Sequence, residues 1–199
     1  FLRQVLHWLV SARNVGAYGD RFRKSISALD HHQRDRCLDT FEIEVAGETG
    51  FLIHFEFFIS TRNGAQYGGQ QLVVCFPEAC NPRPTFQLSR ERTLTTLLGG
   101  QDIDFSGTSA AERFSSAYRL RGPDEPAIRQ YFNNRRLEYF AERPQLTIQS
   151  NGYLAIWDED FPALVSQRPH AELLPDVLRV LLETSQVLLS DARNREKLD

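Results

Sequence analysis

The chain has 199 residues, a formal net charge of −3, and a globular balance of 41% hydrophobic and 25% charged residues. This length suits one moderately large domain. The acidic balance argues against the global basic field of a nucleic-acid-binding domain, so no nucleic-acid partner is expected. Three cysteines without framework spacing favour a reducing compartment over a disulfide-stapled secreted domain.

Residues 1–39 are predicted to form a helix and a polar connector. Leucine and valine recur at helical spacing over residues 1–14, and residues 15–39 are polar and aperiodic. No run reaches the roughly 20 apolar residues of a membrane-spanning helix. The opening FLRQVLHWLV fits either the end of such a span, with the following arginines on the cytoplasmic side, or a surface helix. Because the chain contains no methionine, we expect it to be a segment of a longer protein.

Residues 40–199 are predicted to form one domain that opens with an antiparallel hairpin. Apolar and polar residues alternate over 41–45, and the alternation resumes over 51–59 after AGETG. This period of two predicts two strands with one apolar face. A third strand is expected over residues 71–76, after a turn marked by an Asn-Gly pair.

The later part of the domain is predicted to mix short helices with strands. The expected elements are an extended segment at 85–89, a short helix at 90–98, a strand at 115–121, a helix from Pro123 to Phe140 that bends at Asn133-Asn134, a hairpin over 145–158 and a closing helix from Pro175 to Asp191. This order predicts an α+β fold, in which an antiparallel sheet built from hairpins carries two longer helices and a short one. The strand–helix alternation of a parallel nucleotide-binding sheet is missing.

Several stretches, taken together, resemble one protein family. They are FLIHFEFFIST with QQLVVCF, TFQLSRER, GGQDIDF, FSSAYRLRGPDEPAIRQYF with LEYFAER, and LLETSQVLL. They are similar to an uncharacterised family of bacterial proteins in which an N-terminal membrane span precedes a soluble cytosolic α+β domain. GGQDIDF and YRLRGPDE are the most specific parts of a resemblance that covers residues 12–190. The resemblance implies membrane association and a location on the cytoplasmic side, and it implies no assigned activity.

Two aspartates are candidate ligand residues. Asp102 and Asp104 form a D-x-D, and an extended backbone points both carboxylates the same way. Such a pair suits Mg²⁺ or Ca²⁺ where further oxygen ligands are present. No third acidic residue follows at a defined spacing, so the simpler interpretation is a solvated turn with Ile103 and Phe105 packed inward. No metal site is predicted.

Arg119 and Arg121 are the candidate anion-binding residues. They precede a helix start at Pro123, where two guanidinium groups and free backbone N–H groups can hold an anion. Ion pairs of the same arginines with Asp124, Glu125 or the two earlier aspartates account for them without a ligand. Both interpretations stay open at the level of the sequence.

His54 lies on a predicted strand of the first hairpin. With the turn centred on Glu48, its side chain would lie near Glu42 on the wetter face. A general base also needs a nucleophile or a bound substrate, and the sequence offers neither. A cross-strand contact is therefore expected.

The other reactive side chains have simpler explanations. His31 and His32 lie on the polar connector, and Cys75 sits in the apolar run LVVCF, where a core thiol is expected. Cys75 and Cys80 give C-x4-C, but a zinc ribbon needs a second pair. The sequence contains no G-x-S-x-G, P-loop, G-x-G-x-x-G or H-E-x-x-H motif. No catalytic residue and no cofactor is predicted.

These patterns favour a non-enzymatic interaction or assembly domain on the cytoplasmic side of a membrane-associated protein. Its expected partners are other proteins and, through an upstream segment, a membrane. The alternative is a metal- or phosphate-dependent hydrolase, or a small anion-binding domain. That alternative would use Asp102, Asp104, Arg119 and Arg121.

Overall fold

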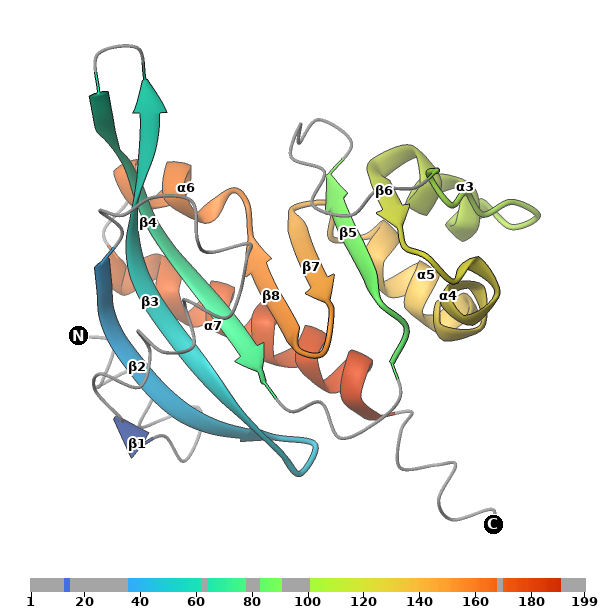
Figure 1. Cartoon of the computed structure of the whole chain (residues 1–199), viewed down its shortest axis with the longest axis horizontal. Helices are drawn as coiled ribbons and strands as arrows, with labels where there is room; N and C mark the ends of the chain where they lie inside the picture. Colours follow the sequence, from blue (N-terminus) through green and yellow to red (C-terminus); the bar gives the residue numbers. More distant parts are fainter. Residues whose placement is uncertain are drawn as a thin grey trace.

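The computed structural model describes residues 13–14, 36–61, 64–77, 83–90, 101–167 and 170–190. Within this part, eight strands form one antiparallel sheet in the order β1-β2-β3-β4-β8-β7-β5-β6 (Figure 1). The strands are β1 (Arg13–Asn14), β2 (Arg36–Val45), β3 (Glu48–Thr61), β4 (Gly64–Phe76), β5 (Phe86–Arg90), β6 (Tyr118–Arg121), β7 (Leu146–Ser150) and β8 (Leu154–Asp158). The helices are α3 (Ser109–Ala117), α4 (Glu125–Tyr131), α5 (Asn134–Ala141), α6 (Phe161–Gln167) and α7 (His170–Leu189). The predicted α+β class is confirmed.

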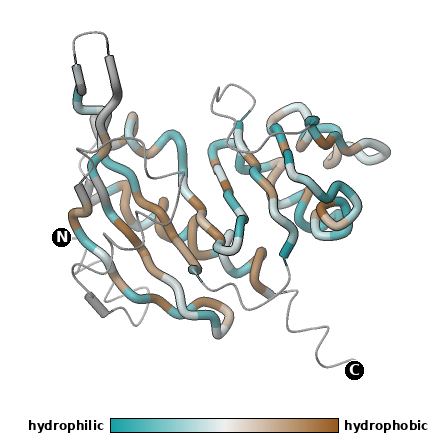
Figure 2. The backbone as a smooth tube through the Cα atoms, in the orientation of Figure 1, coloured by the Kyte–Doolittle hydropathy of each residue, from teal (hydrophilic) through white to brown (hydrophobic). Residues whose placement is uncertain are grey.

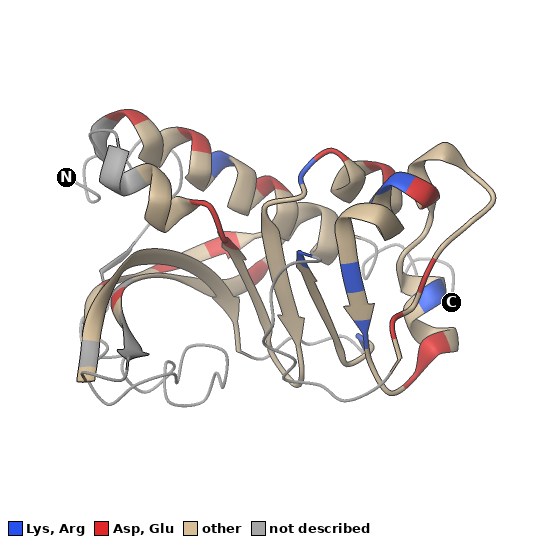
Figure 3. Cartoon of the chain, turned by 90° about the horizontal axis from the view of Figure 1, so that it is seen from above, with Lys and Arg blue, Asp and Glu red and all other residues tan. Residues whose placement is uncertain are grey.

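The main hydrophobic core lies between the helices and one face of the sheet. Figure 3 shows α7 lying over that face, and Figure 2 shows hydrophobic residues along β4, β8 and α7. The core is rich in phenylalanine. Its fully buried phenylalanines come from β4, β5 and the four helices α3 to α6 or the residues next to them: Phe76, Phe86, Phe114, Phe132, Phe140 and Phe161. One core therefore joins the sheet to all the described helices.

The first hairpin is confirmed, but its predicted apolar face is wrong. Phe41 pairs with Leu52, and Glu42 pairs with Phe51, because the chain turns at Ala46-Gly47 rather than at Glu48. Both turn residues lie in the left-handed region, with φ of 52° and 74°, as a type I′ hairpin turn requires.

The new register changes which side chains share a face, because an odd shift moves a strand's side chains to the opposite side. Leu52 joins the main core, whereas Phe51 and Ile53 are buried on the other face with Val73. The predicted contact of His54 with Glu42 is wrong for the same reason. His54 pairs with Asp39, and its Nε2 lies 3.1 Å from Gln70 Oε1.

The strand predicted over residues 115–121 is wrong in its first half. Residues 109–117 form α3, and only residues 118–121 are extended as β6. Thr108 caps the helix, since its Oγ1 accepts a hydrogen bond from Ala111 N at 3.1 Å. Phe114 of this helix is fully buried, so a short helix that the sequence patterns did not predict contributes to the core.

The predicted helix from Pro123 to Phe140 is two helices. α4 ends at Tyr131, and Asn133 caps α5 by accepting a hydrogen bond from Arg136 N at 3.1 Å. The Asn-Asn pair therefore separates two helices rather than bending one. The hairpin over 145–158 is confirmed as β7 and β8, with Gly152 at a φ of 71° in its turn.

The predictions near the two ends and before residue 101 have mixed outcomes. α7 begins at His170, five residues before the predicted start, and keeps Pro175 inside the helix. Arg13–Asn14 form a strand rather than the end of a helix, and β2 begins at Arg36, within the predicted connector. The rest of residues 1–35 lies outside the described residues, as do residues 91–100 with most of the predicted helix at 90–98.

Candidate functional site

The predicted Asp/Arg cluster lies at the β6 edge of the sheet. Ile103 N donates a hydrogen bond to Leu120 O at 2.8 Å, so residues 102–104 run alongside the outer edge of this strand. Ile103 is buried in the main core, and Phe105 packs on Phe114. Asp102 and Asp104 are exposed. The prediction that Ile103 and Phe105 pack inward is therefore confirmed.

Three of the four candidate residues meet in ion pairs. Arg121 Nε donates a hydrogen bond to Asp102 Oδ1, and Arg119 Nε lies 3.9 Å from Asp102 Oδ2. The hydrogen bond and charge of Arg121 hold the pKa of Asp102 below its ordinary value. Asp104 takes part through its backbone, where its carbonyl accepts a hydrogen bond from Arg129 Nη1 at 2.8 Å.

This geometry accounts for the two arginines within the chain. An external phosphate or carboxylate would compete with the Asp102 carboxylate for both guanidinium groups. The predicted N–H donors after Pro123 also have an acceptor of their own, since Asp124 Oδ1 accepts a hydrogen bond from Ala127 N at 3.1 Å. Among the described residues, no group of three or more His, Cys, Asp or Glu side chains is placed to hold a metal ion. The hydrolase or anion-binding alternative stays a prediction.

Backbone contacts explain why this segment has a fixed shape. Ser115 Oγ accepts a hydrogen bond from Phe105 N at 2.7 Å and lies 3.1 Å from Phe105 O, so one side chain of α3 holds both polar groups of that residue. Gly122, directly after β6, lies so close to β5 that a Cβ there would be 2.3 Å from Thr85 O. The shape of the segment around Asp102 and β6 thus depends on steric fit as well as on charge.

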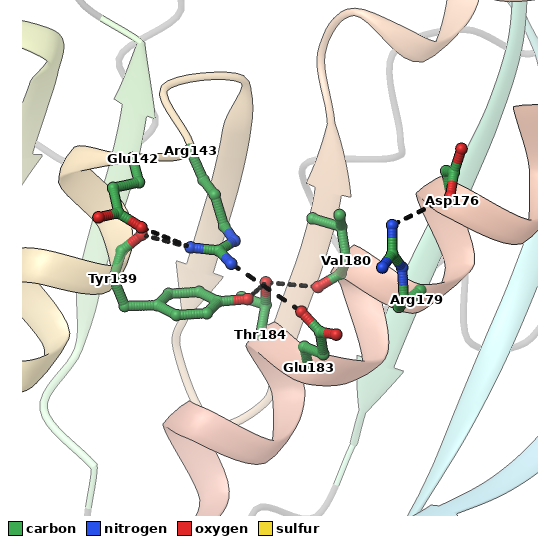
Figure 4. Close-up of polar contacts among 8 residues, drawn as sticks. All are labelled: Tyr139, Glu142, Arg143, Asp176, Arg179, Val180, Glu183 and Thr184. Atoms are coloured by element: carbon green, nitrogen blue, oxygen red, sulfur yellow. Dashed lines mark hydrogen bonds and ion pairs between the residues drawn. The ribbon is translucent and has the colours of Figure 1, made fainter.

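Polar side chains between α5 and α7 hold these two helices together (Figure 4). Tyr139 Oη lies 2.8 Å from Thr184 Oγ1, which in turn donates to Val180 O at 2.6 Å. The Arg143 guanidinium stacks on the Tyr139 ring at 3.9 Å and reaches Glu183 at 4.0 Å. These contacts stabilise the helical layer.

Two further titratable groups are buried in the fold. Cys75 is fully buried, and burial raises the pKa of its thiol to about 12, so the predicted core thiol is confirmed. Asp158 is 5% exposed, and burial raises the pKa of its carboxyl group to about 6. Its Oδ1 accepts a hydrogen bond from Asp160 N at 2.8 Å, which shapes the turn between β8 and α6.

A projecting arm, which the sequence patterns did not predict, is the second candidate site. β2 pairs with β3 up to Glu56, and β8 pairs with β4 from Val73 onward. Between these limits β3 and β4 pair with each other as far as Thr61 and Gly64, and Figure 1 shows them extending beyond the rest of the sheet. We call residues 57–61 and 64–69 the β3–β4 arm. Its Tyr67 is a large aromatic residue with 54% of its surface exposed.

The base of the arm is shaped by a bulge and supported by α6. The register shifts between Phe57, which pairs with Gly69, and the next residue of β3, which pairs with Tyr67. Gly69 has a φ of 139°, and a Cβ on it would lie 3.1 Å from Pro162 Cβ of α6. The sequence signals were the uninterrupted Phe-Phe-Ile run after Glu56 and the glycines around the tyrosine.

Comparison with known proteins adds no relative: no protein-family model matches the chain, and neither does any curated protein or solved structure. The resemblance to a family of membrane-associated bacterial proteins therefore stays a prediction.

Proposed function

We propose that this chain is a non-enzymatic protein-interaction domain that contacts its partner through the β3–β4 arm. The observation that carries the proposal is the arm itself, which leaves the sheet and presents Tyr67 with 54% of its surface exposed. Two isolated strands are marginally stable in water, so an arm of this kind gains stability when a partner covers it. Tyrosine is enriched in protein interfaces because its ring offers a large, rigid contact area with a polar end.

The remainder of the fold suits a scaffold that holds such an arm. The strands of the arm continue into the centre of the sheet, where Val73 and Val74 are fully buried on opposite faces. Pro162 of α6 contacts the arm at Gly69. A partner bound to the arm would therefore be coupled to a rigid body, as binding elements on well-packed scaffolds are.

A photo-crosslinking experiment tests the proposal. A photoreactive phenylalanine analogue replaces Tyr67 in the full-length protein, expressed in the cells that make it. The matched control places the same analogue at Gln130, an exposed residue of α4 that does not belong to the arm. We expect a discrete covalent adduct from position 67 and none from position 130. Equal labelling at both positions, or no adduct at position 67, would contradict the proposal.

The membrane tether is a separate part of the proposed function. It concerns the sequence upstream of Phe1. Of the described helices, none is long and apolar enough to cross a membrane. The gene sequence upstream of Phe1 tests the tether, which requires a stretch of about 20 apolar residues there.

A further inference from the structure

The turn that connects β8 to α6 holds the base of the β3–β4 arm. Asp158 is the last residue of β8, and its backbone carbonyl accepts a hydrogen bond from Gln71 Nε2 at 2.8 Å. Gln71 is a buried residue of β4 that lies just beyond Gly69, at the base of the arm. On the other side of the turn, Pro162 of α6 contacts the arm at Gly69. The same turn therefore contacts the base of the arm both through β8 and through α6.

The side chain of Asp158 fixes the start of α6. Its Oδ1 accepts a hydrogen bond from Asp160 N at 2.8 Å, and the backbone N–H of Phe161 also donates to this carboxyl group. Such contacts set the direction of a helix, because its first N–H groups have no acceptor within the helix. Asp158 thus orients α6 through its side chain and binds β4 through its backbone.

This carboxyl group is buried beside other acidic groups. Asp158 is 5% exposed, and the carboxylates of Asp160 and Glu159 on the same turn repel its negative charge. The phenol of Tyr118 on β6 is a further titratable group within range of its charge. Burial and like charges both disfavour the ionised form of a carboxyl group.

The elements packed around the turn supply no counter-charge. Arg90 of β5 pairs with Asp160 Oδ1 at 2.9 Å. Neither β4 nor α6 contains a charged residue, and the charged residues of α7 from Glu172 onward are exposed. Among the described residues, no cation therefore pairs with Asp158, and a proton neutralises this buried carboxylate instead.

The direction of the pH dependence follows from this burial. Burial raises the pKa of Asp158 to about 6, whereas the ordinary value of 3.8 applies once the turn opens to water. A carboxyl group with a higher pKa in the closed turn stabilises the closed turn at low pH. This contribution is lost as the pH rises through about 6. Mild acid therefore favours the closed turn, and neutral pH favours its opening.

We propose that protonation of Asp158 is a switch that fixes the base of the β3–β4 arm, because it closes the turn between β8 and α6 on Gly69 and Gln71. The inference rests on the proposed interaction function and adds its regulation. An arm that is held in one orientation loses less conformational freedom on binding, so the partner should bind more tightly in mild acid than at neutral pH.

Amide hydrogen exchange of the full chain tests this coupling at about pH 5 and about pH 7.5. The reporters are the amides of Gln71 and Leu164 and their neighbours. Only amides that are less protected than global unfolding in urea predicts are compared, because these exchange through local opening. Protection is expected to be about tenfold higher at the lower pH. Amides of α5, which the neutral Asn133 caps, are the internal control and should keep the same protection.

Two substitutions assign the effect to Asp158. Asp158→Asn keeps a hydrogen-bond acceptor and removes the charge. In this variant, the arm base should show at neutral pH the protection that the wild type reaches only in acid. Asp176→Asn removes an exposed carboxylate of α7 and should leave the tenfold change in place. Circular dichroism verifies the fold of both variants.

Three results would overturn the inference: equal protection of the arm base at both pH values, a pH dependence that persists in Asp158→Asn, and the same change in α5. The crosslinking experiment at position 67 separates this failure from that of the proposed function. An adduct, combined with exchange that does not depend on pH, removes the switch and leaves an interaction domain. The absence of any adduct removes the interaction function and, with it, its regulation.

Discussion

Replacement of Arg136 by methionine should destabilise the fold strongly, because the buried guanidinium group of this residue caps the C-terminal ends of two helices. Arg136 is 3% exposed. Its Nη2 donates to Leu188 O at 3.3 Å, near the end of α7, and its Nη1 donates to Tyr131 O at the end of α4. The guanidinium also stacks on the Tyr131 ring at 3.9 Å.

The magnitude follows from the carbonyl groups that would lose a charged donor. A hydrogen bond to a charged group contributes about 1.5–3 kcal/mol, and the last carbonyls of a helix also interact favourably with a positive charge. The contacts with Leu188 O and with Val187 O, at 3.3 and 3.4 Å, are long, so we weight them below the contact with Tyr131 O. Methionine restores part of the packing. We therefore expect Arg136→Met to lower the free energy of unfolding by about 3 kcal/mol.

Urea unfolding, followed by circular dichroism and by tryptophan fluorescence, measures this change. Arg136→Lys keeps the charge but loses the planar fork, so an intermediate loss is expected. Arg135→Met is the matched control. Arg135 is exposed, so its replacement should change the free energy of unfolding by less than about 0.5 kcal/mol. A loss for Arg136→Met no larger than that of the control would refute the capping role.

Three further substitutions address charge and packing elsewhere. Burial raises the folded-state pKa of Asp158 to about 6, so its charged form opposes folding above that pH. Stability should rise as pH falls from about 6 to 4, and Asp158→Asn should remove this dependence and stabilise the fold by about 1–3 kcal/mol at pH 8 in thermal and urea unfolding. Stabilisation that is absent at pH 8 would contradict the assignment. Gly122→Ala should lower the unfolding free energy by at least about 2 kcal/mol, because its Cβ would meet Thr85 O; an unchanged urea midpoint would be inconsistent with that contact. Asp102→Asn should cost less than about 1 kcal/mol, with a difference that shrinks in high salt, since the ion pair is partly exposed; a salt-independent loss of several kcal/mol would be incompatible with this view.

The strands were predictable from the sequence, but their register was not. The period of two over residues 41–45 and 51–59 identified two strands correctly. Which pair of residues makes the turn depends on Ala46 adopting a left-handed conformation that alanine rarely takes, and AGETG offers glycines that look more suitable. A turn centred on Glu48 would therefore exchange the two faces of β3.

Candidate contacts were predictable within the segment around β6 and not where they depend on the rest of the sheet. Asp102 lies about twenty residues before Arg121, and the ion pairs proposed between this aspartate and the two arginines are present. The arm was missed because alternation predicts a strand without showing whether other strands accompany it. The limits of the arm are set by where β2 and β8 pair, at Glu56 and Val73, and those positions depend on the whole sheet.

The edge of the sheet at β6 is closed to further strands. It is covered by the segment around Ile103 and carries the charges of Asp102, Arg119 and Arg121, which are devices that discourage strand addition. The residues that the sequence offered as an anion site therefore also protect an edge of the sheet.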